Sequence, residues 1–205
     1  MSLPAGHGGV VLGAKLTLQE LPGCAAIRLW LVDSATDLDA CYRAAWSVEK
    51  TPMWAFCWGS GLALARYIFE HPEMVRGKTV VDFGCGSGVV AIAAALVGAR
   101  AFAVDSDEEA LAFASANAAE NGVAVEAQAE LPDEYDLLLA SDVLYEREAR
   151  DFILGLRSRG KPIVIADALR PGTIAPPEAP FAELASRAFP DVDPPMDRAY
   201  FYRLE

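Results

Sequence analysis

The segment VVDFGCGSGVV, residues 80–90, places three glycines at alternate positions, Gly84, Gly86 and Gly88, directly after a β-branched run. An apolar stretch, VVAIAAALVGA, follows. This order predicts a buried strand, a glycine-rich turn and a helix with apolar residues all round. Glycine lets a backbone come close to a ligand, so the segment suits a nucleotide-like ligand. The segment leaves open which ligand that is.

Strand-like and helix-like segments alternate after residue 78 and extend this unit to a larger fold. The expected strands are TVVDF (79–83), AFAVD (101–105), VAVEAQAE (123–130), YDLLLASD (135–142) and KPIVIAD (161–167). The expected helices between them are 89–99, 107–122 and 146–160, with glycine at or near each end. This alternation predicts an α/β fold, a parallel sheet with helices on both faces.

The two ends of the chain depart from this alternation. Two β-prone runs in residues 14–34, separated by Pro22-Gly23, predict a hairpin, and 36–50 are expected to be helical in part. A helix is expected before Pro72. Near the C-terminus, FAELASRAF (181–189) is expected to be a helix and AYFYRLE (199–205) an antiparallel edge strand. We expect a single domain over 1–205, with 1–77 as an N-terminal extension and 78–205 as the cofactor-binding core.

Composition excludes several classes of protein. The 205 residues are 53% apolar, 22% charged and carry a net charge of -12, which fits a globular chain and disfavours nucleic acid as a partner. Four scattered cysteines and two histidines predict no metal site and a reducing compartment. The longest apolar run, 89–98, is about half of the ~20 residues that span a bilayer. The chain is therefore expected to be soluble and cytoplasmic, with no membrane partner.

The glycine spacing and one acid narrow the ligand. No lysine follows the glycines, which excludes a P-loop, and Val89 stands where a dinucleotide motif starting at Gly84 needs its last glycine or alanine. Asp82, at the end of the strand, would repel a pyrophosphate but suits a ligand with an amino group or a sulfonium. Asp105, at the end of the next strand, suits ribose hydroxyls. Together these features indicate S-adenosylmethionine, with S-adenosylhomocysteine as the product.

With these features in place, the chain resembles the seven-β-strand S-adenosylmethionine-dependent methyltransferases, which have a Rossmann-like, mostly parallel seven-stranded sheet. The segments WAFCWGSGLALARYI, VRGKTVVDFGCGSGVVAIAAA and ASDVLY are similar to the family-16 lysine methyltransferases. Within that group the resemblance is closest to the electron transfer flavoprotein β-subunit lysine methyltransferases and their bacterial relatives. It covers roughly residues 14–170, and its most specific mark is D-x-x-Y, here Asp142 to Tyr145.

The resemblance implies positions for the cofactor and the acceptor. The cofactor contacts that it implies are Trp58 at the methionine end, Asp82 near the amino group, Gly84, Cys85, Gly86 and Gly88 at the turn, Asp105 at the ribose and Ser141 beside the cofactor. Leu131 stands where relatives often have a tryptophan against the adenine. Asp142 and Tyr145 are the expected catalytic residues: the aspartate orients the incoming amine, and the tyrosine flanks it.

Structural alternatives accompany these assignments. Asp142 could instead cap the helix 146–159, and Tyr145 could be a core aromatic with a satisfied hydroxyl. Trp54 is expected to be a core aromatic, and Cys85 a small filler and not a nucleophile.

Three functions stay open at this point. The first is a protein-lysine methyltransferase with a protein acceptor. The second is an N-methyltransferase for a small, nicotinamide-like amine. The third is not a transferase: a cofactor-binding protein that acts through partners, or a dinucleotide oxidoreductase. Asp82 and the glycine spacing disfavour the oxidoreductase, and Asp142 with Tyr145 disfavours the non-enzymatic function.

Overall fold

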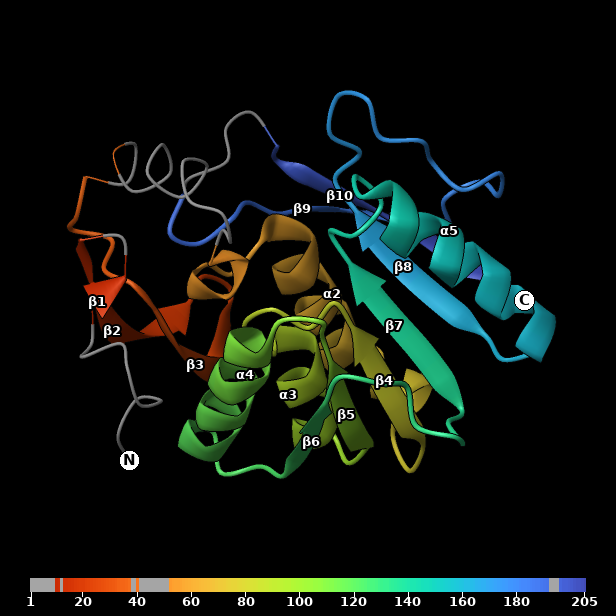
Figure 1. Cartoon of the computed structure of the whole chain (residues 1–205), viewed down its shortest axis with the longest axis horizontal. Coiled ribbons are helices and arrows are strands. Elements are labelled where there is room, and N and C mark those ends of the chain that lie inside the picture. Colours follow the sequence, from red (N-terminus) through yellow and green to blue (C-terminus); the bar gives the residue numbers. More distant parts are fainter. Residues whose placement is uncertain (1–9, 12, 38–39, 41–51, 192–195) are drawn as a thin grey trace.

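The computed structural model describes residues 10–11, 13–37, 40, 52–191 and 196–205 (Figure 1). The helix expected within 36–50 and Cys41 lie almost entirely outside this part of the chain. The strands are β1 (Val10–Val11), β2 (Ala14–Leu21), β3 (Cys24–Val32), β4 (Thr79–Phe83), β5 (Arg100–Val104), β6 (Val125–Gln128), β7 (Leu137–Ser141), β8 (Ile163–Asp167), β9 (Ala182–Ala185) and β10 (Arg198–Leu204). The helices are η1 (Met53–Ala55), α2 (Gly59–Glu70), η2 (Pro72–Met74), α3 (Val89–Leu96), α4 (Glu108–Glu120), α5 (Arg147–Gly155) and η3 (Leu156–Arg159).

Seven strands form the main sheet in the order β6-β5-β4-β7-β8-β10-β9. The first five run parallel, and β10 is antiparallel to both β8 and β9. The expected mostly parallel sheet with an antiparallel edge is confirmed. The C-terminal strand β10 lies one position inside that edge, because β9 pairs with its outer side.

The helix expected over 181–189 is wrong: residues 182–185 form the edge strand β9. Ala182 to Ala185 pair with Phe201 to Arg198 of β10, and the backbone N–H of Phe181 donates to the carbonyl of Phe201 (2.8 Å). Helix propensity is a weak preference that a free sheet edge can outweigh, because pairing satisfies the backbone groups of both strands. The sequence alone does not show that β10 leaves this edge open.

Apolar residues of the sheet divide into two clusters that face opposite layers of helices. Helices α2, α3 and α4 pack with Val80, Leu139 and Phe201 on one face. Residues of α5 and η3 pack with Val81, Leu138 and others on the second face. Helices on both faces are therefore confirmed (Figure 1). In the described part of the chain, no helix combines the length and the apolar character needed to cross a membrane.

The β2–β3 hairpin, which the sequence predicts, packs beside α4 through two asparagines. Asn117 accepts a hydrogen bond from the backbone N–H of Trp30 (2.8 Å), and its amide donates to the carbonyl of Ser87 in the glycine turn (2.9 Å). One helical turn further on, Asn121 bonds both backbone groups of Arg28. The two asparagines thus form hydrogen bonds with backbone groups of β3. Through its bonds to Trp30 and Ser87, Asn117 also connects the hairpin to the glycine turn.

Replacing Asn117 by alanine is expected to destabilise the fold by about 2–4 kcal/mol, because two buried backbone groups lose their partner. That corresponds to a fall in Tm of roughly 5–12 °C for a chain of this size. Thermal unfolding of the variant measures this. Asn121→Ala is the matched control: its site is less buried, water can replace its bonds, and the expected loss is about 1 kcal/mol or less. Equal losses for both variants would contradict the assigned role of Asn117.

Candidate active site

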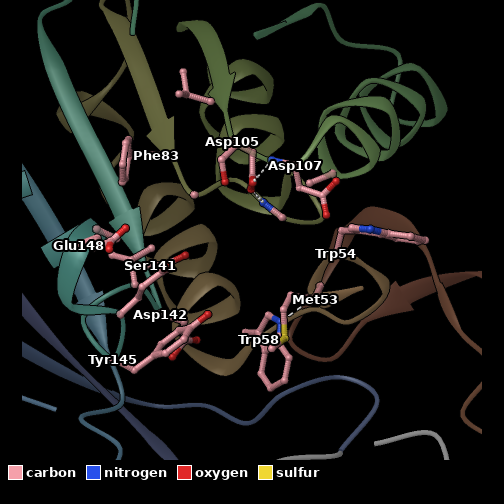
Figure 2. A pocket seen from close by; sticks show the side chains of 18 of the residues that line it. Met53, Trp54, Trp58, Phe83, Asp105, Asp107, Ser141, Asp142, Tyr145 and Glu148 are labelled. Atoms are coloured by element: carbon pink, nitrogen blue, oxygen red, sulfur yellow. Dashed lines mark hydrogen bonds between the residues drawn. The ribbon is translucent and has the colours of Figure 1, made fainter. Parts of the chain in front are cut away.

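Since the carboxyl ends of parallel strands meet at one edge, the loops after β4, β5, β7 and β8 converge there and line a cavity of about 820 Å³. The η1–α2 connection closes its remaining side. Figure 2 shows side chains of residues that line this cavity. The lining residues include Met53, Trp54, Trp58, Phe83, Gly84, Gly86, Asp105, Asp107, Ser141, Asp142, Tyr145, Glu148, Phe152 and Arg170.

One end of the cavity is formed by the glycine turn and Asp105. The carboxylate of Asp105 accepts hydrogen bonds from the backbone N–H groups of Gly86 (3.0 Å) and Asp107 (3.0 Å), one on each oxygen. Each oxygen keeps a lone pair for a hydroxyl of a ligand. Gly84 has φ +69°, and an added Cβ would lie 2.8 Å from Cγ1 of Val143. A diol-bearing ligand fits here, close to bare backbone.

At the other end, Asp142 joins three segments of the chain. It has φ +53°, a left-handed conformation that is rare outside glycine and marks a constrained position. Its Oδ1 accepts a hydrogen bond from Nη1 of Arg170 (2.6 Å), and its Oδ2 accepts one from the backbone N–H of Ser60 (3.0 Å). Ser60 lies in the first turn of α2, whose N-cap residue Trp58 makes no side-chain cap bond. Asp142 therefore caps α2 from a distant loop and not α5.

Two aromatic rings lie near the guanidinium that binds this carboxylate. The guanidinium carbon of Arg170 lies 5.3 Å from the ring centroid of Trp58 and 6.0 Å from that of Tyr145. Trp58 is held by a bond from its Nε1 to the carbonyl of Met53 (2.9 Å). Tyr145 is 50% exposed, so it is not the core aromatic considered as an alternative. This end of the cavity thus combines a carboxylate and two aromatic faces, the chemistry that attracts an organic cation.

Asp167, at the end of β8, positions the two loops that carry these groups. Its carboxylate accepts hydrogen bonds from the backbone N–H groups of Leu144 (3.1 Å) and Leu169 (2.8 Å). Burial, together with the charge of Asp142, raises the pKa of Asp167 to about 6. Both loops are thereby fixed to the same side chain of the sheet.

Seven of the eleven sequence-predicted site residues line the cavity: Trp58, Gly84, Gly86, Asp105, Ser141, Asp142 and Tyr145. The other four, Asp82, Cys85, Gly88 and Leu131, are not among the residues that line it. Cys85 is buried in the core, where burial raises the pKa of its thiol, in keeping with a filler role. Gly88 begins α3 at φ +81°, against Ala114. Leu131 packs on the second face of the sheet, and Ala129 lines the cavity near that place.

Asp82 is the fourth residue, and the structure gives it a different role. It is 1% exposed, and its Oδ2 accepts a hydrogen bond from the backbone N–H of Ala91 (3.0 Å), in the first turn of α3. Its Oδ1 has no hydrogen-bond partner among the described residues. Burial, with a contribution from Asp105, raises the pKa of Asp82 to about 7. The carboxylate lies behind the turn and supports the helix that begins there.

Asp82→Asn is expected to stabilise the ligand-free protein at neutral and higher pH. The folded-state pKa of about 7 lies above the ordinary 3.8, so burial of this group costs no stability below about pH 4. The cost grows between about pH 4 and pH 7, levels off above pH 7, and reaches at most about 4 kcal/mol. The amide oxygen of asparagine still accepts from Ala91. Tm measured from pH 4 to 9 should show an advantage of the variant that appears only as the pH rises.

The control for this prediction is Asp136→Asn. Asp136 is exposed and also accepts a backbone hydrogen bond, from Thr79 (2.8 Å), but its charge is in water. It should show no pH-dependent gain. An Asp82→Asn advantage that is equally large at pH 4 and pH 8 would contradict the role of the buried charge.

Several residues that line the cavity were not predicted as site residues from the sequence, among them Met53, Phe83, Asp107, Phe152 and Arg170. Arg170 had a signal in the sequence, because it follows the fifth strand at the carboxyl edge where ligands bind. Met53 and Phe152 had none, since only packing brings η1 and α5 to the cavity.

Comparison with known proteins agrees with this geometry. Residues 63–152 match the family model described as ribosomal protein L11 methyltransferase (PrmA). The human (Homo sapiens) electron transfer flavoprotein beta subunit lysine methyltransferase is 36% identical over 121 residues, 50% of this chain and 42% of that protein. The ribosomal protein L11 methyltransferase of Edwardsiella ictaluri is 42% identical over 96 residues, 45% of this chain and 29% of that protein. The aligned region spans about half or less of the length of these relatives.

A solved structure shares the fold. The magnesium protoporphyrin IX methyltransferase of Synechocystis PCC 6803, determined with bound S-adenosylhomocysteine, aligns with a TM-score of 0.54 and 16% identity over 70% of this chain and 80% of that chain. This chain therefore has the fold of that methyltransferase, with a cavity at the carboxyl edge of its parallel strands. The match of residues 63–152 to that family model and the similarity to the lysine methyltransferases confirm the resemblance that the motifs predict.

Proposed function

We propose that this chain is a protein-lysine N-methyltransferase that uses S-adenosylmethionine. The observation that supports this most is the composition of one cavity. It has a turn and a carboxylate suited to a ribose at one end, and Trp58, Asp142 and Tyr145, suited to an amine, at the other. The names of the relatives point the same way, since one group methylates a lysine of a flavoprotein subunit and the other methylates a ribosomal protein.

The residues present fit the cofactor. Asp105 offers free lone pairs to a diol, and Gly84 and Gly86 leave bare backbone beside it. Five acids line the cavity, Asp105, Asp107, Asp142, Glu146 and Glu148, and their field favours a cationic ligand. When bound, S-adenosylmethionine supplies a methyl group on a sulfonium, which an amine lone pair can displace.

The chain's own contribution is to align the amine and exclude water. Asp142 still has a lone pair on each oxygen after its two bonds, so it can accept a hydrogen bond from the amine and orient its own lone pair toward the methyl group. Tyr145 and Trp58 flank that position with their rings. Transfer of the methyl group to a neutral amine gives a protonated, methylated amine. This product releases one proton, which Asp142 or solvent accepts.

A protein acceptor agrees with the rim of the cavity. Tyr145 is 50% exposed, so solvent reaches the amine end of the site directly. A lysine carries its amine on a flexible four-carbon stem and can enter from a protein surface. We further propose that the enzyme acts in the cytoplasm. The free, buried thiols of Cys24, Cys57 and Cys85 are in keeping with a reducing compartment.

The test is incubation of the purified protein with methyl-labelled cofactor and a host lysate depleted of small molecules. Label in a discrete protein band, recovered as methyl-lysine after acid hydrolysis, is the expected result. Label that appears only when small amines are restored would refute the protein acceptor in favour of the small-molecule enzyme. The variant Asp142→Asn serves as the control for background labelling.

A further inference from the structure

An arginine of this chain lies in the amine end of the cavity. Arg170, in the loop after β8, lines the cavity together with Trp58, Asp142 and Tyr145. Its guanidinium is hydrogen-bonded to the carboxylate of Asp142 at 2.6 Å and lies near both rings. A carboxylate and two aromatic faces would hold an ammonium, but here they already hold a cation.

The charge of Arg170 has a consequence for any amine that binds there. A guanidinium stays protonated at every relevant pH, so it repels a second cation and also neutralises the carboxylate that would attract one. A neutral amine avoids this repulsion and can still donate a hydrogen bond to Asp142. Only the neutral amine has the lone pair that a methyl transfer needs.

We propose that Arg170 sets the protonation state of the acceptor, because its contact with Asp142, Trp58 and Tyr145 disfavours the ammonium and admits the neutral amine. Arg170 is thus a specificity residue for amine charge. The inference rests on the proposed amine methylation. It assigns to Arg170 the task of lowering the pKa of the lysine, so that the ammonium loses its first proton to solvent; the proton released after transfer still goes to Asp142 or solvent.

Other titratable groups face this position and must be kept constant in a test. Asp142, Tyr145 and Glu146 come from the β7–α5 loop, Asp167 from β8, and Asp105 from the far end of the cavity. The pKa of Asp167 is about 6, so this group is ionised above pH 7. Desolvation by burial raises the pKa of the Tyr145 hydroxyl from its ordinary value, which favours the neutral hydroxyl. Measurements between pH 7 and 10 therefore report mainly on the bound amine.

The decisive probe is sinefungin, a cofactor analogue with a primary amine in place of the methylsulfonium. Its affinity relative to S-adenosylhomocysteine, measured by calorimetry from pH 7 to 10, reports the pKa of an amine at the methyl position. One charge at about 6 Å corresponds to about one to two pH units at an intermediate dielectric. Arg170→Gln should raise the pH at which the sinefungin affinity curve inflects by that amount. It should also bind sinefungin about tenfold more tightly, or more, at pH 7. Arg170→Lys should have the inflection and the affinity of the wild type.

Two further variants complete the design. Arg170→Met is a second neutral variant in case Arg170→Gln folds poorly, with affinity for S-adenosylhomocysteine as the check of the fold. Arg203→Gln, on β10, removes an exposed arginine outside the residues that line the cavity. If the sinefungin affinity curve inflects at the same pH in wild type, Arg170→Gln and Arg170→Met, the proposal is overturned. If the wild type methylates no amine, the proposed function fails, but the sinefungin titration still decides the role of Arg170.

Discussion

Methyl transfer by Asp142→Asn should be about 10²–10³-fold slower than by wild type, with cofactor affinity changed no more than about threefold. A positioned group that orients a reacting amine and handles its proton contributes an effect of this size. Asparagine tolerates the left-handed backbone of this position, at φ +53°, and its amide oxygen can still accept from Ser60. The substitution therefore removes the charge and the partner of Arg170 while it retains the cap of α2.

Single-turnover rates with saturating cofactor measure this effect apart from product release. Glu148→Gln is the control, because Glu148 also lines the cavity but is exposed and lies at its rim. We expect that variant to lose less than about fivefold. A folded Asp142→Asn protein with wild-type rates would leave Asp142 as a helix cap only.

Gly84→Ala should weaken cofactor binding about 100-fold or more and destabilise the protein by about 2–4 kcal/mol. Gly84 has φ +69°, which costs a residue with a side chain about 1–2 kcal/mol. In addition, the new Cβ would lie 2.8 Å from Cγ1 of Val143, a stiff β-branched side chain that cannot move away cheaply. The turn must shift, and the turn is a wall of the cavity.

Calorimetry with S-adenosylhomocysteine and thermal unfolding measure the two parts of this effect. Gly160→Ala separates them, since Gly160 has a similar φ of +63°, open space around it and no contact with the cavity. It should show the backbone cost of about 1–2 kcal/mol and normal binding. If Gly84→Ala binds the cofactor as well as Gly160→Ala does, the turn does not form the cofactor wall.

The sequence predicted the parts of the site that local chemistry dictates. A strand followed by Gly84 and Gly86 can make only a tight, bare turn, and an acid directly after the next parallel strand must reach the same edge, as Asp105 does. The D-x-x-Y segment also stands at the end of a parallel strand, so Asp142 and Tyr145 reach that edge too. These predictions required only the strand order and the alternation of elements.

Tertiary structure decided whatever depends on partners distant in the sequence. Asp82 faces the N-terminus of α3 and not the cavity. A side chain at the end of a strand can contact either a helix or the cavity, and only the packing of the folded protein decides between them. Residues 182–185 became a strand because β10 offered an unpaired edge. Arg170 meets Asp142 across 28 residues of sequence, and Asp142 caps a helix 82 residues before it.

The sequence by itself therefore determined the fold class, the glycine turn that lines one end of the cavity and the residues at the strand ends, because backbone alternation and glycine geometry act over a few residues. Only the tertiary structure decided the electrostatics of the amine end. The charges that surround an amine beside Asp142 depend on Arg170 and the two aromatic rings, which come from separate segments. Coulomb interactions depend on distances in space, and spacing along the chain does not fix those distances.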